Sequence, residues 1–551
     1  ILSESFNGKD ICFEFKESKL FLSNIVLSID EIKDLEDKFN YVISNYNLDI
    51  QLKEICLSDN SADTFIQKIE NFLNEKTPFL PLQIYNQLNS EREYVAVVDK
   101  DNSYSNKELL DLINKSYLLI EKYNLSEKST IILHGQLNAK MIASSIAIWL
   151  QGYTLVLLDS ELNDERKRQI LASINPSLII SNIIDNSFNY KKLTFDKIDT
   201  VDSTNTITID EPQNWHKIPA YITFTSGSTG EPKGILSSHQ GFSHFINWQK
   251  QEFNIDETHR CGQFTSITFD VIYRSVFTPL LGGATLLLSP FDVFESQNTV
   301  NWISENKITM FNIVPSVLNF WLDTTQVEEL KNLKYIFSAG EKLTNSLLKK
   351  LKIKWRYHSY IINFYGPSET TLAKFYKKIL NNQNFTQEII DVGQPIPDTK
   401  VYILNDSKKC SLNEVGEVVI KTPFMSFGYL NYDNKNFRVL DPNNSEDVYY
   451  FTGDLGKITL DGNLLIIDRI DNQVKINGIR IELGEIESIV AQSNYTKESA
   501  VVFYDDKLFL FIVPQLSDQN IKDSLEKFLE KKLPEYMLPK EIFIEGSLPK
   551  N

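Results

Sequence analysis

The segment at residues 221–234 holds the side chains whose types and spacing point most clearly to chemistry. An apolar run at 221–224 is followed by a loop of hydroxylated residues and glycines with one lysine: Thr225, Ser226, Gly227, Ser228, Thr229, Gly230, Glu231, Pro232, Lys233 and Gly234. Glycine lets the backbone approach a ligand closely, and successive N–H groups in such a loop can converge on phosphate oxygens. The pattern therefore predicts a phosphate-binding loop behind a buried strand, with a flexible surface turn as the alternative. Since no Gly-Lys-Ser/Thr occurs, it is not a Walker A loop.

This loop resembles the signature segment of the adenylate-forming superfamily, which includes peptide-synthetase adenylation domains, acyl-CoA synthetases and luciferases. Other segments resemble family motifs in the same order, at residues 363–371, 416–417, 428–431, 450–455, 468–487 and 533–539. The resemblance covers about residues 80–551. It implies an enzyme that uses ATP to form an acyl-adenylate. Taken singly, most of these short patterns would be read as turns, so the interpretation depends on the ordered set.

The resemblance also implies roles for individual residues. We expect catalytic roles for Thr225, Lys233, Glu369 and Lys475. Expected nucleotide contacts are Thr225, Ser226, Gly227, Ser228, Thr229, Gly230, Gly340, Glu341, Asn363, Tyr365, Gly366, Ser368, Asp454 and Arg469. These types suit a nucleotide, since Tyr365 offers an aromatic face for adenine and Asp454 a carboxylate for the ribose hydroxyls. Glu369 offers the hard oxygen ligand that Mg²⁺ prefers. A solvated charged face is the alternative for Arg469 and Lys475.

Details of the sequence favour an amino acid as the substrate. Residues 473–475 and 482–487 resemble the peptide-synthetase forms of their motifs, and Asp270 stands where amino-acid-activating relatives hold the α-ammonium group. The alternative for Asp270 is a buried helix cap. The expected pocket lining is Asp270, Val271, Tyr273, Asn312, Phe337, Ala339, Phe364, Leu372 and Ala373. Because none of these offers a counter-charge to a substrate side chain, we expect a small or medium uncharged amino acid.

The family's second half-reaction implies partners and a moving lobe. The acyl group is expected to pass to the phosphopantetheine thiol of a peptidyl carrier protein, with a condensation domain in the same longer chain and an MbtH-like accessory protein as further partners. Asp471 is the expected hinge. The family's last catalytic lysine is expected beyond Asn551, and Lys550 does not take its role. An acyl- or aryl-CoA ligase of the same superfamily, or a noncatalytic scaffold, remain the alternatives.

Strand-like runs that alternate with helical patterns predict the elements that position these residues. We expect an α/β fold with a large adenylate-forming core at 76–471, partly β-barrel-like, and a small α+β lobe at 472–551. Strands are expected at 129–133, 154–158 and 177–180, and an amphipathic helix at 519–532. Residues 1–75, with a helical pattern at 32–46, loosely resemble the end of a condensation domain and its linker.

Composition excludes several classes of function. The formal net charge of −17 argues against a nucleic-acid partner, which requires a basic face. The four cysteines lie far apart, with neither disulfide-framework nor zinc-ligand spacing, as expected in a reducing cytosol. No run of 18 apolar residues and no signal pattern occurs, so we expect no membrane association and a cytoplasmic location. The richest apolar stretch, 141–158, predicts a buried helix followed by a strand.

Overall fold

The structure is a computed structural model of the 551-residue chain. It describes residues 2–6, 9–16, 19–23, 78–100, 102–183, 190–203, 209–226, 231–325, 330–355, 359–380, 383–405, 408–440, 448–471, 473–504, 507–515 and 520–549. These fall into two compact units, one of Ile1–Pro78 with Pro395–Lys400, and one of Phe79–Gln394 with Val401–Asn551. Each unit is described by itself.

In the first unit the described residues form one antiparallel sheet. Its strands are β1 (Leu2–Phe6), β2 (Lys9–Lys16) and β3 (Lys19–Ser23), in the order β1-β2-β3. Leu2 pairs with Phe13, and Cys12 pairs with Ser23. The helix expected at 32–46 lies outside the described residues.

One sheet of the second unit has six strands and leads into the phosphate-loop segment. Its order is β11-β10-β7-β6-β8-β9. The strands are β6 (Thr130–Gly135), β7 (Thr154–Asp159), β8 (Leu178–Ser181), β9 (Lys192–Leu193), β10 (Pro219–Thr225) and β11 (Lys233–Ser238). Strands β6, β7 and β8 pair in parallel and are almost fully buried, as parallel strands covered by helices on both faces usually are. The accompanying helices are α4 (Asn106–Glu121), α5 (Ala139–Leu150) and α6 (Asp164–Ile174).

A nine-stranded sheet carries most of the other expected site residues. Its order is β18-β17-β16-β15-β14-β12-β13-β4-β5. The strands are β4 (Val95–Asp99), β5 (Asn102–Ser105), β12 (Arg260–Gln263), β13 (Thr285–Leu288), β14 (Met310–Ile313), β15 (Tyr335–Ser338), β16 (Tyr360–Tyr365), β17 (Phe375–Leu380) and β18 (Gln394–Pro395). Helices α9 (Ser296–Glu305), α10 (Pro315–Thr324) and α11 (Asn345–Lys354) pack over one of its apolar clusters.

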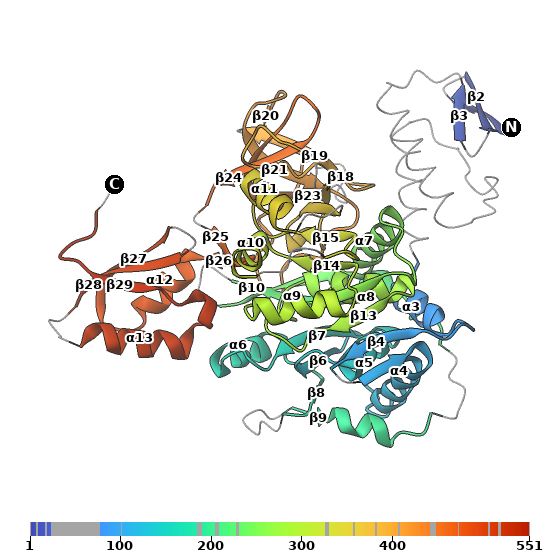
Figure 1. Ribbon diagram of the computed structural model, residues 1–551, viewed down its shortest axis with the longest axis horizontal. Helices are drawn as coiled ribbons and strands as arrows, with labels where there is room; N and C mark the ends of the chain where they lie inside the picture. Colours follow the sequence, from blue (N-terminus) through green and yellow to red (C-terminus); the bar gives the residue numbers. More distant parts are fainter. Residues whose placement is uncertain are drawn as a thin grey trace. The chain divides into compact units, whose positions relative to one another are not determined.

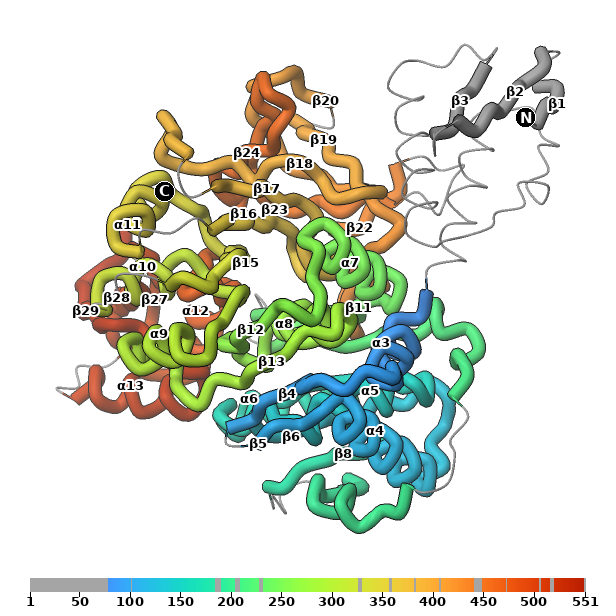
Figure 2. The backbone as a smooth tube through the Cα atoms, turned by 45° about the vertical axis from the view of Figure 1, so that its right-hand side comes forward, coloured from blue at the N-terminus to red at the C-terminus, as the bar shows by residue number. Residues whose placement is uncertain are grey.

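Helices α3 (Leu80–Leu88), α7 (His239–Glu252) and α8 (Val271–Gly282) form a layer between the two sheets. Helix α7 packs on β10 and β11, whereas α8 packs on β12 and β13. Figure 1 shows α8 beside β13, and Figure 2 shows α7 near β11. Aromatic side chains fill this layer: the rings of Tyr221 and Tyr273 stack with centroids 3.6 Å apart. This layer fixes α8, the helix that carries Asp270 at its start.

A third sheet of this unit follows in sequence. It consists of β19 (Lys400–Asn405), β20 (Lys408–Lys409), β21 (Gly416–Lys421), β22 (Phe437–Val439), β23 (Val448–Ile458) and β24 (Leu464–Arg469). The order is β20-β19-β21-β23-β22, with β24 also paired to β23. The antiparallel register sets Asp454 of β23 opposite Arg469 of β24.

The C-terminal lobe, red in Figure 1, has its own core. Its elements are the hairpin β25 (Gln473–Ile476) and β26 (Ile479–Glu482), helices α12 (Leu483–Ala491) and α13 (Ile521–Lys532), and strands β27 (Thr496–Tyr504), β28 (Lys507–Pro514) and β29 (Glu541–Ile544). Arg166 of α6 forms a buried 2.9 Å ion pair with Glu485 of α12, which ties this lobe to the larger one.

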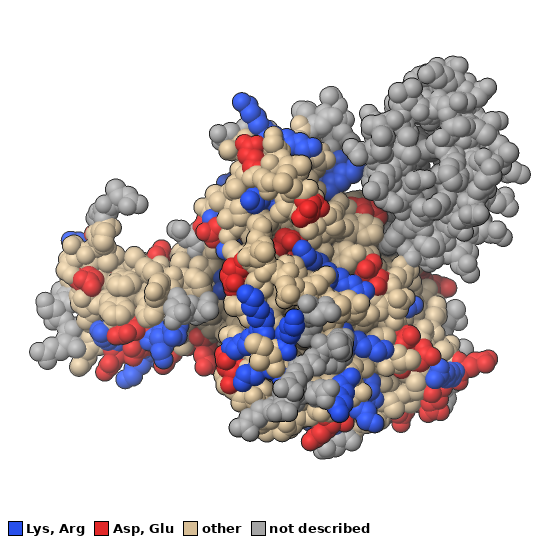
Figure 3. Space-filling view, turned by 45° about the horizontal axis from the view of Figure 1, so that its top comes forward, with Lys and Arg blue, Asp and Glu red and all other residues tan. Residues whose placement is uncertain are grey.

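These elements confirm the expected α/β fold, with its large core and small α+β lobe. The strands expected at 129–133, 154–158 and 177–180 are β6, β7 and β8, and the helix expected at 519–532 is α13. None of the described helices is both long and apolar enough to cross a membrane. On the face shown in Figure 3, lysine and arginine side chains are interspersed with aspartates and glutamates.

Candidate functional site

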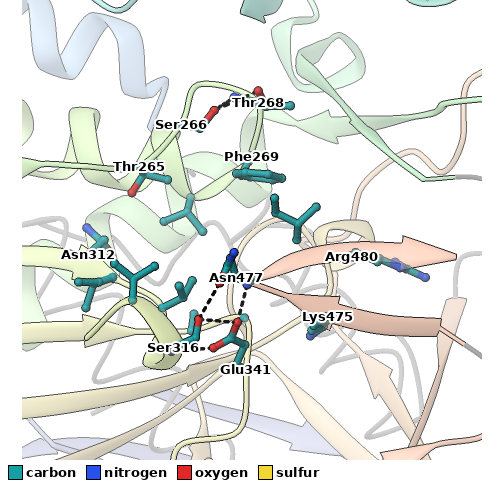
Figure 4. Close-up of a pocket in the computed structure, with 18 of the residues that line it drawn as sticks. Thr265, Ser266, Thr268, Phe269, Asn312, Ser316, Glu341, Lys475, Asn477 and Arg480 are labelled. Atoms are coloured by element: carbon teal, nitrogen blue, oxygen red, sulfur yellow. Dashed lines mark hydrogen bonds between the residues drawn. The ribbon is translucent and has the colours of Figure 1, made fainter. Parts of the chain in front are cut away.

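A cavity of about 2120 Å³ lies where the large lobe meets the C-terminal lobe. The ends of β10, β14 and β16, the start of α8 and the β25–β26 hairpin all contribute to its lining. Figure 4 shows this meeting point, with Thr265, Phe269 and Asn312 on the side of the large lobe and Asn477 at the tip of the hairpin. Most of the predicted site residues that the structure describes therefore line one cavity.

The phosphate-loop segment is described at its two ends only. Gly227, Ser228, Thr229 and Gly230 lie outside the described residues. Thr225 and Lys233 are paired across β10 and β11. The Lys233 Nζ atom lies 6.0 Å from the ring centroid of Tyr432 and is not among the described residues that line the cavity. Thr225 and Ser226 do line it.

Ser226 contacts the C-terminal lobe directly. Its hydroxyl donates to the carbonyl of Arg480 at 2.7 Å and accepts from the backbone N–H of Glu482 at 3.1 Å. Ser226, the second residue of the predicted loop, is therefore held by strand β26 in this arrangement.

The residues expected to bind adenine and ribose meet at the C-terminal end of β16. Tyr365 donates its hydroxyl to Asp454 at 2.5 Å, and Arg469 donates to the other oxygen of that carboxylate at 2.9 Å. Burial and the adjacent carboxylate raise the pKa of Tyr365, so its hydroxyl stays a donor. Asn363 donates its amide N–H to the backbone carbonyl of Asp391 at 3.0 Å. The cavity wall includes Asn363, Tyr365, Asp454 and Arg469.

Glu369 is completely buried in the short 3₁₀ helix at Ser368–Thr370. Its Oε1 atom accepts from Tyr429 at 2.6 Å and from Arg480 at 2.7 Å, and its Oε2 atom has no hydrogen-bond partner among the described residues. Burial alone would raise the pKa of this carboxyl, but Arg480 and Tyr429 outweigh it and hold the pKa below its ordinary value. Glu369 is therefore a buried anion, and it is not among the described residues that line the cavity.

Gly340 and Glu341 receive the tip of the hairpin. Glu341 accepts from the backbone N–H and the hydroxyl of Ser316, at 2.8 and 2.9 Å, and from the N–H of Gly478 at 2.6 Å (Figure 4). A Cβ atom on Gly340, whose φ is +92°, would lie 3.2 Å from the Cα atom of Gly478. This contact therefore requires glycines. Lys475, on β25, faces the same space (Figure 4).

Asp471 lies between β24 and β25, where the chain passes from the large lobe to the small one. Its carboxylate makes a two-point ion pair with Arg469, at 2.7 and 2.5 Å. Burial alone would raise the pKa of Asp471, but the Arg469 guanidinium lowers it overall. The expected hinge residue is therefore tied to the residue that binds Asp454.

The cavity holds seven of the nine residues that were expected to line a substrate pocket. Its wall includes Asp270, Val271, Asn312, Ala339, Phe364, Leu372 and Ala373. Tyr273 was expected here, but it stacks on Tyr221 in the helical layer and is 1% exposed. Phe337 was also expected, but it lies in the core and stacks on Phe364, with centroids 5.7 Å apart.

The cause of the Tyr273 error is the helical period. Adjacent residues of a helix point about 100° apart, so Tyr273 and Arg274 face different surroundings. Arg274, four positions after Asp270, therefore shares the cavity face with it and lines the wall in place of Tyr273.

Sequence reasoning also assigned no role to Arg480, Tyr429 or Ser316. The periodicity of α8 could have found Arg274. No local signal could have shown that Arg480 reaches Glu369, because 111 residues separate them in the chain.

Comparisons with known proteins agree with this architecture. The family model for "AMP-binding enzyme" matches residues 84–430, and that for "AMP-binding enzyme C-terminal domain" matches residues 485–551. A plipastatin synthase polypeptide of Bacillus subtilis (strain 168) is 30% identical over 470 residues, which are 82% of this chain and 13% of that protein. The chain thus spans about an eighth of the length of this curated relative.

Two solved structures share the fold. The adenylation domain AlmE of Vibrio cholerae, in complex with glycyl-adenosine-5'-phosphate, matches with a TM-score of 0.73 and 20% identity, over 86% of this chain and 95% of that one. NpsA-ThdA, an artificially fused adenylation-PCP di-domain from Klebsiella oxytoca, matches with a TM-score of 0.74 and 19% identity, over 84% and 93%. Since the first family model alone covers more than half of the sequence, this chain belongs to the AMP-binding enzyme family.

Proposed function

We propose that this chain is the amino-acid adenylation domain of a peptide synthetase. ATP and an amino acid would give aminoacyl-AMP and pyrophosphate, and the acyl group would then pass to a carrier-protein thiol with release of AMP. One observation carries the proposal: a single cavity is lined by Asp270, which can hold an ammonium group, and by Tyr365 and Asp454, which can hold a nucleoside. The carboxylate of an amino acid bound at Asp270 would therefore face the nucleotide side of the same space.

The nucleotide contacts follow from the donors and acceptors present. Because the Asn363 N–H is already bonded to Asp391, its amide oxygen remains as the acceptor for an adenine amino group. Asp454 would exchange its bonds to Tyr365 or Arg469 for the ribose hydroxyls. Thr225 and Ser226, with Gly227, Ser228, Thr229, Gly230 and Lys233, would enclose the phosphates.

The surroundings of Glu369 fit a divalent cation. Its Oε2 atom is buried without a hydrogen-bond partner among the described residues, and a carboxylate oxygen is a ligand that Mg²⁺ prefers. A bound Mg²⁺ would neutralise charge on the phosphates. The protein's own contribution would be positional and electrostatic, with Lys475 as a cation facing the reacting groups.

The relatives suggest the wider setting. The plipastatin synthase polypeptide is far longer than this chain, and NpsA-ThdA joins an adenylation domain to a PCP domain. We therefore expect a peptidyl carrier protein with its phosphopantetheine as the acyl acceptor, and a condensation domain and an MbtH-like protein as further partners. Asp471 would act as the hinge that lets the small lobe serve both half-reactions.

Amino-acid-dependent exchange of labelled pyrophosphate into ATP tests the proposal. We expect exchange with at least one amino acid and none with the matching carboxylic acid that lacks the amine. Exchange with the amine-free acid at equal efficiency would identify a CoA or aryl-acid ligase instead. No exchange together with no measurable ATP binding would identify a noncatalytic scaffold.

A further inference from the structure

Arg274 is a buried cation in the wall of the substrate pocket. It lies one helical turn after Asp270 on α8, and it is 3% exposed. Its guanidinium carbon lies 4.7 Å from the ring centroid of Phe364, another residue of the wall. The ring face attracts the cation but accepts none of its five N–H donors through a lone pair.

No ion pair or hydrogen bond to the Arg274 side chain occurs among the described residues, and its Nε atom is buried without a partner. A guanidinium that is buried and unpaired is strongly disfavoured. Burial lowers the pKa of Arg274 to about 10, so the side chain still carries its charge at neutral pH. The pocket therefore holds a positive charge that the described part of the chain leaves unsatisfied.

Asp270 does not supply the missing partner for the Arg274 guanidinium. The two charges attract each other through space, but no ion pair within 4 Å joins them among the described side chains. Burial raises the pKa of the Asp270 carboxyl, while a hydrogen bond from Ser368 and the charge of Arg274 oppose that rise. The pocket thus has a negative group at the start of α8 and a positive group one turn along it.

We propose that the pocket selects an α-amino acid with a carboxylate side chain, of the aspartate or glutamate class. The α-ammonium would pair with Asp270 and the side-chain carboxylate with Arg274. The buried Asn312 amide lies in the same wall and adds a polar group to it, with an Oδ1 atom that has no partner among the described residues. This inference rests on the proposed function and replaces the expectation of an uncharged substrate, which overlooked Arg274.

The first test requires no mutation. Binding of L-glutamate, L-aspartate, L-glutamine, L-asparagine and glutarate is measured by calorimetry with the full chain, and pyrophosphate exchange is measured for each. An acidic amino acid should exceed its amide isostere by on the order of 10² to 10³-fold in kcat/KM, because the amide leaves a buried charge unpaired.

Each other outcome of that test overturns a different statement. A preference for an uncharged amino acid would overturn this inference and leave the proposed function standing. Activation of glutarate as well as glutamate would overturn the pairing with Asp270. Absence of exchange with every amino acid tested would refute the proposed function as well.

Arg274→Gln and Arg274→Lys give the second test. The first should lower kcat/KM for the acidic substrate by about 10² to 10³-fold while changing the amide isostere far less, and the second should recover part of the loss. ATP affinity should be unchanged in both. Arg438→Gln is the matched control, because Arg438 also stacks on a phenylalanine, at 4.0 Å from Phe451, but on an exposed strand. An equal loss for both substrates in the Arg274 variants would show a merely structural role and overturn the proposal.

Discussion

The substitution Arg480→Gln would remove the positive charge that the C-terminal lobe places next to the Glu369 carboxylate. Arg480 is about one-fifth exposed and Glu369 is fully buried, with 2.7 Å between their charged atoms. Removing one partner of a buried ion pair typically costs about 3–5 kcal/mol, since the other charge is left unpaired. Tyr429 keeps its 2.6 Å hydrogen bond, and Arg480 is partly solvated, so we expect a smaller loss of about 2–3 kcal/mol.

This loss should appear as weaker docking of the hairpin. Two amide protons report on that equilibrium, because Gly478 donates to Glu341 and Glu482 donates to Ser226 only while the hairpin is docked. Amide hydrogen exchange at these positions should accelerate by roughly 30- to 150-fold in the variant, which corresponds to about 2–3 kcal/mol. Exchange within the buried β6 and β7 strands should not change.

The effect should also depend on pH. The pKa of Glu369 is depressed below its ordinary value of 4.5, so the ion pair contributes fully at pH 7 and is lost as the pH falls from 4.5 through the lowered pKa. The difference between the wild type and the variant should therefore shrink in acid. The control is Arg168→Gln, because Arg168 pairs with Glu165 on the surface and should contribute less than about 1 kcal/mol. Unchanged exchange in Arg480→Gln at pH 7 would refute the reasoning.

Three further substitutions test other parts of the site. Asp270→Ala should reduce amino-acid binding by about 2–5 kcal/mol with ATP affinity unchanged, and an unaltered kcat/KM would contradict the assigned role. Asp471→Pro should slow thiol transfer more than adenylation, because proline fixes the backbone φ angle. The control is Asp471→Ala, which removes only the ion pair with Arg469 and should have a smaller effect. Equal effects of Asp471→Pro on both half-reactions would refute the hinge role. Arg166→Ala should destabilise the docked C-terminal lobe by about 3–5 kcal/mol, measured by urea denaturation, since its partner Glu485 would be left buried; a change below about 1 kcal/mol would show that the pair is dispensable.

Local pattern was sufficient for most of the fold. The apolar runs that became β6, β7 and β8, and the amphipathic stretch that became α13, are determined by periodicities that a single sequence displays. The pairing of β24 with β23, which joins Arg469 to Asp454, depends on long-range register. The sequence could place both residues in a nucleotide site only through the family resemblance.

The lining of the proposed substrate pocket could not be predicted fully from sequence motifs. Asp270 was recognisable because it follows Phe269 in a motif, and the expectation for its neighbours on α8 rested on the same resemblance. Adjacent side chains on a helix point about 100° apart. The prediction named Tyr273, which lies in the core, in place of its neighbour Arg274, which lies in the cavity wall. That single step changed the expected charge of the substrate.

The docked hairpin uses three of the groups that the proposed reaction needs. Ser226, Glu341 and Glu369 are each expected to face the nucleotide or its cation, and each is bonded here to residues 478–482 of the C-terminal lobe. A cation on the Oε2 atom of Glu369 would repel the Arg480 guanidinium that is bonded to Oε1. Binding of the proposed cation and docking of the hairpin would therefore be linked with opposite sign, and by reciprocity each would weaken the other by the same factor.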